Sequence, residues 1–583
     1  MPLGGGKTGS ENSGDPQQGE VIKEFPREGG TIKEGGTYNL CGEYKGCLYL
    51  KLEPGDSAVV NVTGDVHSEV GEQEAVLALQ SGNVTINNNN HVFTVTGPAD
   101  GGGRCYYNSL YSNAKPETTI NGGIYRCSSS NLETLFNYTG ILWLNDVTSE
   151  AAVADAVNNW ATTYINGGKY DSGSLTILNR WATSHIEFDG NVRVHVDQGN
   201  ALANHGTAVI NDGTYTNEGG TGPTVGNGGI LTFNDGTITA PNGAAILNTT
   251  SPTTGRTGVT TINGGTIKDS KYGIQVSSGQ VTLNDVTFSN NENDIYLKQG
   301  MMITIADGFT KRATIKVEDP SDRRRLTEGE NEPGLNLVSN NSGYKVAYDE
   351  TEKYYYLTPR TGYMVDAVDA TAKDENDVVI TPNDDITVGT KVTLTADPAP
   401  GGQKFADWFV TVNGDVRSDL LNFPTDGDQT TATFIMPKGN VMVKAEYEPV
   451  EPVDPADPSG EVDPVLTGAI VTGAVLVGAY EAGTGIYRLA HMRGIPLPSN
   501  RIELAELVWE RAGKPEPQNM TDENLYADID TDDTDAQKAA HWMVEQELMK
   551  FDEDNNKFHP CFPVSKLRVC LTWQNAKDKG LID

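Results

Sequence analysis

The first half of the chain repeats a short alternation of apolar and polar residues. In each copy, two apolar or Thr positions flank one position that is most often Thr, and a corner of Asn, Asp and Gly follows. A period of two is typical of a strand with one buried face, and Asn, Asp and Gly tolerate the positive φ of a sharp bend. The copies are Ile120-Asn121-Gly122-Gly123, Leu144-Asn145-Asp146, Ile165-Asn166-Gly167-Gly168, Phe188-Asp189-Gly190, Ile210-Asn211-Asp212-Gly213, Phe233-Asn234-Asp235-Gly236, Ile262-Asn263-Gly264-Gly265 and Leu283-Asn284-Asp285.

The spacing of these corners predicts a solenoid. Successive corner Asn or Asp residues are 21 to 29 positions apart by subtraction, and a period in this range indicates stacked repeats that bury their apolar faces against one another. Helical spacing is absent, and the chain holds 65 glycines, which argues against helical repeats. A second buried segment begins four residues after most corners, at Tyr125, Tyr170, Tyr215, Ile238, Ile267 and Phe288, whereas Ser149 and Arg193 break it.

This repeat resembles the right-handed parallel β-helix of pectate-lyase-like proteins. The resemblance implies turns stacked at about 4.8 Å, with a ladder of amides formed by the corner Asn side chains. Weaker copies at 62–65, 86–88 and 305–308 extend the register. We therefore expect residues 22–358 to form the solenoid together with an irregular β cap, because the last turn would otherwise expose a sheet edge.

Residues 359–449 predict a separate β module. Val392-Thr393-Leu394-Thr395-Ala396 alternates, Phe405 and Trp408 follow, and 432–447 closes the segment with Met436-Pro437-Lys438-Gly439. This pattern resembles the divergent internalin-type B-repeat of bacterial, Firmicutes-like surface proteins. The resemblance implies a small β-grasp-like spacer without chemistry of its own, in which Trp408 belongs to the core.

A linker and an apolar segment follow the β module. Residues 450–464 are rich in Pro and acids and predict an extended linker. Residues 465–487 are almost uncharged apart from Glu481, so they predict either a membrane helix or an Ala/Gly-rich helix that packs on its own module.

Residues 488–583 predict a small helical module with a second resemblance. The segment 499–509 is similar to the start of an S-layer homology repeat, and the segments 526–529, 540–548 and 558–568 match its later parts. Modules of that family bind cell-wall polymer, which makes Arg501 and Glu503 candidate contacts. About one repeat is present, so a structural cap or a partner-docking unit is the alternative.

Composition limits the partners and the compartment. The net charge of -36 argues against nucleic acid as a partner and is typical of a secreted or cell-surface protein. Residues 1–21 predict a disordered tail, and no apolar signal-peptide core is visible in them.

The six cysteines fall into three local pairs, which would allow three disulfides in an oxidising compartment, with inert thiols as the alternative. None of the pairs has the spacing of a zinc site, and no cofactor motif is present. The disulfide candidates are Cys41 with Cys47, Cys105 with Cys127, and Cys561 with Cys570.

The outward position of the repeat supplies the candidate ligand site. Thr is the usual residue there, and three consecutive copies depart from it with Trp143, Tyr164 and Glu187. Exposed aromatic rings beside an acid suit a sugar, which needs apolar contact and hydrogen bonds. Residues 150–160 predict a short helical insertion that would cover this surface, and in that case the rings would only pack beneath it.

Catalysis at the corners is not expected. Asp146, Asp212, Asp235 and Asp285 recur at one position of the repeat, which indicates turn chemistry, whereas a catalytic residue should depart from the repeat.

The sequence therefore predicts a non-catalytic extracellular or cell-surface protein that binds a glycan or a host or cell-surface ligand. A polysaccharide lyase or glycoside hydrolase on the solenoid face is the alternative, and a purely structural spacer is the second. An acid and a base within reach on the Trp143–Glu187 face would favour the enzyme, and burial of that face would favour the spacer.

Overall fold

The computed structural model describes residues 22–449 except 54, 72–73, 97–102, 109–114, 129–130 and 425–428, and most of residues 498–582. The predicted tail 1–21, the linker 450–464 and the apolar segment 465–487 lie outside the described residues. Within the described part of the chain, no helix is long and apolar enough to cross a membrane. The chain divides into two compact units; the first holds the solenoid and most of the β module, and the second holds the C-terminal helices.

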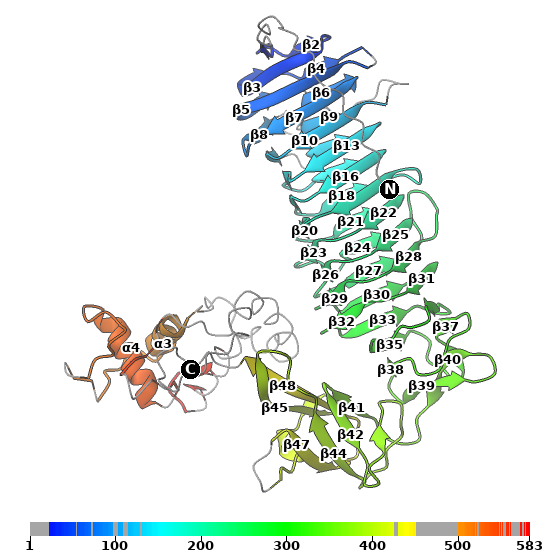
Figure 1. Ribbon diagram of the computed structural model, residues 1–583, viewed down its shortest axis with the longest axis vertical. Helices are drawn as coiled ribbons and strands as arrows, with labels where there is room; N and C mark the ends of the chain where they lie inside the picture. Colours follow the sequence, from blue (N-terminus) through cyan, green and yellow to red (C-terminus); the bar gives the residue numbers. More distant parts are fainter. Residues whose placement is uncertain are drawn as a thin grey trace, which may run out of the picture. The chain divides into compact units, whose positions relative to one another are not determined.

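The first unit contains the predicted β-solenoid, whose strands stack one above another from β2 to β38 (Figure 1). Each turn contributes up to three strands, which we call the first, second and third positions. The third positions form a 14-stranded parallel sheet: β2 (Gly30–Ile32), β4 (Leu48–Lys51), β6 (Ala75–Ser81), β9 (Arg104–Asn108), β12 (Leu135–Asn137), β15 (Val157–Asn159), β18 (Leu175–Asn179), β21 (Asn200–Asn204), β24 (Val225–Asn227), β27 (Ala244–Asn248), β30 (Tyr272–Val276), β33 (Asn293–Leu297), β35 (Ala313–Val317) and β38 (Leu337–Ser339).

The first and second positions share a 23-stranded sheet, because the long strands β3 (Gly36–Lys45) and β5 (Ser57–Glu69) run through both; β1 (Lys23–Glu24) pairs with β3. The first positions are β7 (Asn83–Asn88), β10 (Glu117–Asn121), β13 (Ile141–Asn145), β16 (Thr162–Asn166), β19 (His185–Asp189), β22 (Thr207–Ile210), β25 (Ile230–Phe233), β28 (Val259–Ile262), β31 (Gln280–Leu283), β34 (Ile303–Ile305) and β37 (Thr327–Glu328). The second positions are β8 (Val92–Thr96), β11 (Ile124–Cys127), β14 (Thr148–Ala151), β17 (Lys169–Ser172), β20 (Arg193–Val196), β23 (Thr214–Asn217), β26 (Thr237–Thr239), β29 (Thr266–Lys268) and β32 (Thr287–Ser289).

The core follows the alternation read from the sequence. The eight residues that precede the corner Asn or Asp are all at most 1% exposed, and Tyr125, Tyr170 and Tyr215 are equally buried on the second position. The corner after Asp189 is one residue longer than its neighbours, so Val194 takes the inward place in register with Tyr170. This longer corner turns Arg193 outward.

A column of buried asparagines runs through the solenoid at the end of the third position. Each side chain is completely buried, and the Nδ2 of every member except the last, Asn248, donates to the Oδ1 of the next Asn at 2.8–3.1 Å. Most of these amides also donate to a backbone carbonyl of the following turn, as Asn179 does to Thr207 O at 3.0 Å. The column, which we call the inner ladder, comprises Asn108, Asn137, Asn159, Asn179, Asn204, Asn227 and Asn248.

The predicted ladder of corner amides is also present, on the outside of the coil and in two parts. One part joins Asn61, Asn87, Asn121 and Asn145, and the other joins Asn211, Asn234, Asn263 and Asn284, through bonds of 2.6–3.1 Å. The interruption falls at Asn166 and Asp189, whose side chains make no hydrogen bond to a described residue. We call the two parts together the outer ladder.

The C-terminal end of the solenoid carries the expected β cap. β39 (Tyr344–Asp349) and β40 (Tyr354–Pro359) form an antiparallel pair that β36 (Arg324–Arg325) extends. Leu357 and Tyr355 of this cap join the solenoid core.

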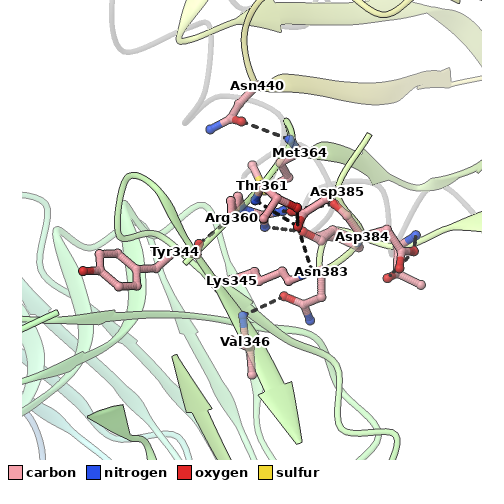
Figure 2. Close-up of polar contacts among 12 residues, drawn as sticks. Tyr344, Lys345, Val346, Arg360, Thr361, Met364, Asn383, Asp384, Asp385 and Asn440 are labelled. Atoms are coloured by element: carbon pink, nitrogen blue, oxygen red, sulfur yellow. Dashed lines mark hydrogen bonds and ion pairs between the residues drawn. The ribbon is translucent and has the colours of Figure 1, made fainter. Parts of the chain in front are cut away.

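Polar contacts tie the cap to the start of the β module (Figure 2). Lys345 on β39 lies 3.0 Å from the Asp385 carboxylate, which also accepts the hydroxyl of Thr361 at 2.8 Å. Arg360, whose side chain is 5% exposed, donates to the carbonyl of Tyr344 and lies 3.4 Å from Asp385. Asn383 accepts the amide of Val346 at 3.1 Å. A buried arginine that is hydrogen-bonded on both sides makes this junction specific.

The β module consists of two four-stranded sheets. The first contains β41 (Val365–Val368), β48 (Val441–Pro449), β45 (Gln403–Val412) and β46 (Asp415–Val416), and the second contains β43 (Val379–Ile380), β42 (Ala370–Lys373), β44 (Lys391–Ala396) and β47 (Thr431–Ile435). Trp408 is 5% exposed and lies in the module's core, as expected.

In the second unit, α3 (Arg501–Arg511) and α4 (Thr534–Glu545) pack around Leu504, Trp509 and Met543.

Two features differ from the sequence-based expectations. Residues 150–160 contain the end of β14 and all of β15 and form no helix; the short Ala- and Val-containing segment is a regular part of the coil. Cys41, Cys47, Cys105 and Cys127 are free thiols rather than the candidate disulfides. The thiol of Cys105 instead donates to the carbonyl of Arg126, and that of Cys127 to the carbonyl of Gly103. Cys561 and Cys570 lie outside the described residues.

We predict that the inner ladder contributes far more stability than the outer one. Asn179→Ala should lower the free energy of unfolding by about 3 kcal/mol, because buried amides and carbonyls lose their partners without access to water. The control Asn234→Ala, in the half-exposed outer ladder, should cost less than about 1 kcal/mol. Urea denaturation of the full chain measures both, and equal losses would contradict the assignment.

Candidate functional site

The three predicted ligand residues lie on consecutive turns. Trp143 on β13, Tyr164 on β16 and Glu187 on β19 are Cα partners in the parallel register. All three side chains are half-buried, so this surface is accessible and the helical cover predicted for it is absent. We call these three residues the aromatic strip.

The two rings of the strip stack on each other. Their centroids are 4.1 Å apart and their planes differ by 16°. The indole Nε1 of Trp143 donates to Glu117 at 2.9 Å, which fixes the ring. Trp143 covers one face of Tyr164, and the next turn contributes Glu187 in register with Tyr164 and the ring of His185, which meets the phenol ring edge to face with the centroids 5.9 Å apart.

Glu187 is held at the end of the strip by two neighbours. Its carboxylate accepts Asn211 Nδ2 at 3.0 Å, and His185 Nε2 lies 3.6 Å from it. Asn211 would otherwise extend the outer ladder toward Asp189. The ladder therefore breaks beside the aromatic rings, and this leaves the amide of Asn166 and the carboxylate of Asp189 without a hydrogen bond to any described residue.

These groups line one shallow hollow. It has a volume of about 410 Å³, and its walls include Tyr164, Asn166, Glu187 and Asp189 together with Trp143. The hollow combines an aromatic face with uncommitted amide and carboxylate groups, which is the combination that sugar hydroxyls and ring C–H groups require.

One pair of carboxylates on this face, Glu117 and Glu187, is too widely spaced for glycoside hydrolysis, whereas Glu187 and Asp189 line the same hollow two residues apart on β19. Glu117 and Glu187 lie three turns apart in the register, or about 14 Å at 4.8 Å per turn, whereas hydrolysis uses carboxyl pairs about 5–10 Å apart. Among the corner acids, Asp212 and Asp235 each accept the amide of the following Gly at 2.6 and 2.7 Å, which is the turn role expected for them.

A second hollow lies around the corner on the same turns. Lys169 and Asp171 on β17 and Arg193 and His195 on β20 line it, together with Glu218. Its volume is about 450 Å³. Lys169 pairs with Asp171 at 2.8 Å, and the hydrogen bond to this carboxylate raises the pKa of Lys169. His195 Nδ1 lies 3.3 Å from Asp171, and its Nε2 lies 3.6 Å from Glu218.

A buried charged column on the third-position sheet has no counterpart in the sequence-based predictions. Arg104, Glu133 and Asp155 occupy one place on three consecutive turns, as the pairing of their strands shows. Arg104 bonds Glu133 at 2.8 Å, and both side chains are at most 10% exposed. Burial, and next the charge of Glu133, raise the pKa of Asp155 to about 7. The column members are 29 and 22 residues apart and differ in type, so repeat analysis does not group them.

The two residues proposed for wall-polymer contact have structural roles. Asn500 caps α3: its Oδ1 accepts the amide of Glu503 at 2.9 Å, and its Nδ2 donates to the Glu503 carboxylate at 3.0 Å, so the two side chains make a reciprocal cap like a capping box. Arg501 donates to the carbonyl of Phe558 at 2.9 Å and lies over its ring. Within the residues that the structure describes, no three His, Cys, Asp or Glu side chains converge as metal ligands would.

Comparison with known proteins identifies one part of the chain. Residues 368–451 match the family model of the divergent InlB B-repeat domain, which supports the resemblance found in the sequence. No curated protein and no solved structure matches the chain.

The raised pKa of Asp155 predicts a pH-dependent stability. The folded state holds the proton more tightly than the unfolded state, where the pKa is about 3.8. The stability that Asp155 gains by holding this proton is therefore fully present below about pH 4 and is lost as pH rises toward 7. Asp155→Asn should remove the loss and raise the stability at pH 8 by roughly 3 kcal/mol, as measured by denaturation between pH 4 and 8. The exposed control Asp307→Asn should show the same dependence of unfolding free energy on pH as the wild type. If Asp155→Asn also keeps this dependence, the raised pKa of Asp155 is refuted.

Proposed function

We propose that this chain is a surface protein of the adhesion type and that its solenoid binds a glycan without turning it over. Support for the general part comes from the long solenoid and from the B-repeat domain at 368–451, a domain that occurs in surface proteins. The aromatic strip supports the binding of a glycan.

The observation that carries the proposal is the break in the outer ladder beside the stacked rings. In other turns, the corner Asn side chains hydrogen-bond one another. Thr or another small residue lies at most outward positions there. At this place the uncommitted groups of Asn166 and Asp189 lie next to two half-exposed aromatic rings. A pyranose ring can pack against the exposed parts of the Trp143 and Tyr164 rings while its hydroxyls bond Asn166, Glu187 and Asp189.

Trp143 has a supporting part in this arrangement. It covers the far face of Tyr164 and is fixed by Glu117, so it holds the phenol ring in one orientation before the ligand arrives. Preorganisation of this kind reduces the entropic cost of binding.

The proposal also includes the details of the fold and the location of the protein. We take the coil to be right-handed and the β module to be β-grasp-like, as the resemblances imply. The C-terminal module would be S-layer homology-like and would serve in anchoring or docking; the structural roles of Arg501 and Glu503 favour docking through other residues. The protein would act outside the cell or at its surface.

Glycan binding by the full chain, measured on a glycan array and then by calorimetry on each hit, tests the proposal. Tyr164→Ala should weaken binding at least about tenfold, because it removes the contact face, and Trp143→Ala should weaken it less. The control Trp181→Ala, an exposed ring in the connection between β18 and β19, should leave affinity unchanged.

Each hit is also assayed for reducing ends and for unsaturated product. Binding without product supports the proposal. Product formation would replace it with the lyase or hydrolase alternative, and the absence of binding to any glycan would leave the spacer alternative.

A further inference from the structure

Arg193 differs from the other arginines of the described chain. Each of the others donates a side-chain hydrogen bond, forms an ion pair or lies over an aromatic ring; examples are Arg104, Arg126, Arg180 and Arg256. The guanidinium of Arg193 makes none of these contacts with a described residue, and its side chain is exposed. The chain holds 79 acidic residues against 43 Lys and Arg, and Arg193 still has no acidic partner among the described residues.

The neighbour of Arg193 in the register is another cation. Lys169 on β17 and Arg193 on β20 are Cα partners, so two positive charges occupy the same outward place on adjacent turns, about 4.8 Å apart along the coil. Like charges directly opposite each other destabilise a sheet. Asp171 already pairs with Lys169 at 2.8 Å, so Arg193 is the charge that a bound anion would neutralise, and Lys169 would add a second attraction.

The two acids of the hollow lie beside Lys169 and His195, and neither pairs with Arg193. Asp171 holds Lys169 at 2.8 Å and His195 at 3.3 Å, and Glu218 lies on the other side of His195 at 3.6 Å. Two neutral groups at the same edge, the amide of Asn191 and the hydroxyl of Thr214, line the hollow and make no side-chain hydrogen bond with a described residue. A cation pair with free amide and hydroxyl donors is the set of groups that binds an oxyanion.

This hollow adjoins the aromatic strip. Glu187, Asp189 and Gly190 belong to the first hollow, and Asn191 and Arg193 belong to the second; the same short corner of the chain forms the boundary of both. A ligand whose ring lies on Tyr164 can therefore place a substituent around the corner.

We propose that the glycan bound by the aromatic strip carries an oxyanion, as a carboxylate, sulfate ester or phosphate, and that Lys169 and Arg193 bind this group in the second hollow with Asn191 and Thr214. This inference rests on the glycan-binding function proposed above. Arg193 is then the residue that determines the preference for acidic over neutral glycans.

The test compares matched oligosaccharides that are neutral, carboxylated, sulfated or phosphorylated, with binding to the full chain measured at two salt concentrations. The acidic ligands should bind at least tenfold tighter than their neutral counterparts, and added salt should reduce the difference. Arg193→Gln should abolish the preference while leaving neutral binding unchanged. Arg126→Gln is the control, because Arg126 lies on the same sheet and is already paired with Glu150 at 2.6 Å. The acidic oligosaccharide that binds most tightly identifies the preferred oxyanion.

The possible results separate the two proposals. Equal binding of neutral and acidic glycans, unaffected by Arg193→Gln, would overturn the oxyanion site and leave the aromatic strip standing. Acidic binding that depends on Arg193 but survives Tyr164→Ala would support the oxyanion site and remove the aromatic strip. No binding of any glycan would overturn both.

Discussion

The inner ladder of asparagines is the interaction on which the rest of the solenoid depends. Parallel strands of consecutive turns stay in register only if every turn closes at the same place, and each buried amide bonds the amide of the next turn and, in most turns, also a backbone carbonyl. A shift of one residue would bury an unpaired amide and turn the core residues outward. The ladder therefore fixes the register, and the register places Trp143, Tyr164 and Glu187 in one column.

A regular scaffold of this kind makes its exceptions informative. Where the coil needs only stability, Thr lies outward and the corner amides bond one another. Around Tyr164 the pattern changes in three ways: aromatic rings replace Thr, Asn211 turns to Glu187, and the corner after Asp189 gains a residue that turns Arg193 outward. These departures fall on neighbouring turns, and no requirement of the fold accounts for them together. Function is the simplest common cause.

Much of this architecture could be predicted from the sequence, because apolar periodicity and corner motifs are local signals. The inward residues, the outer ladder, the β cap and the B-repeat follow from such patterns. The inner ladder does not, since its asparagines end third-position strands of variable length and sequence, and only the stacking of the turns reveals that they meet. The pairing of Arg104, Glu133 and Asp155 likewise exists only between turns. The helix expected at 150–160 was wrong because Ala-rich composition is weak evidence when the coil dictates a strand.

The most direct test of the account is hydroxyl-radical footprinting of the full chain with and without the glycans it binds. Trp143 and Tyr164 should become protected together when glycan is present, whereas the exposed ring of Trp181, in the connection between β18 and β19, should keep its reactivity. Protection at Trp181 with unchanged reactivity at Trp143 and Tyr164 would place the ligand on another face and contradict the central claim.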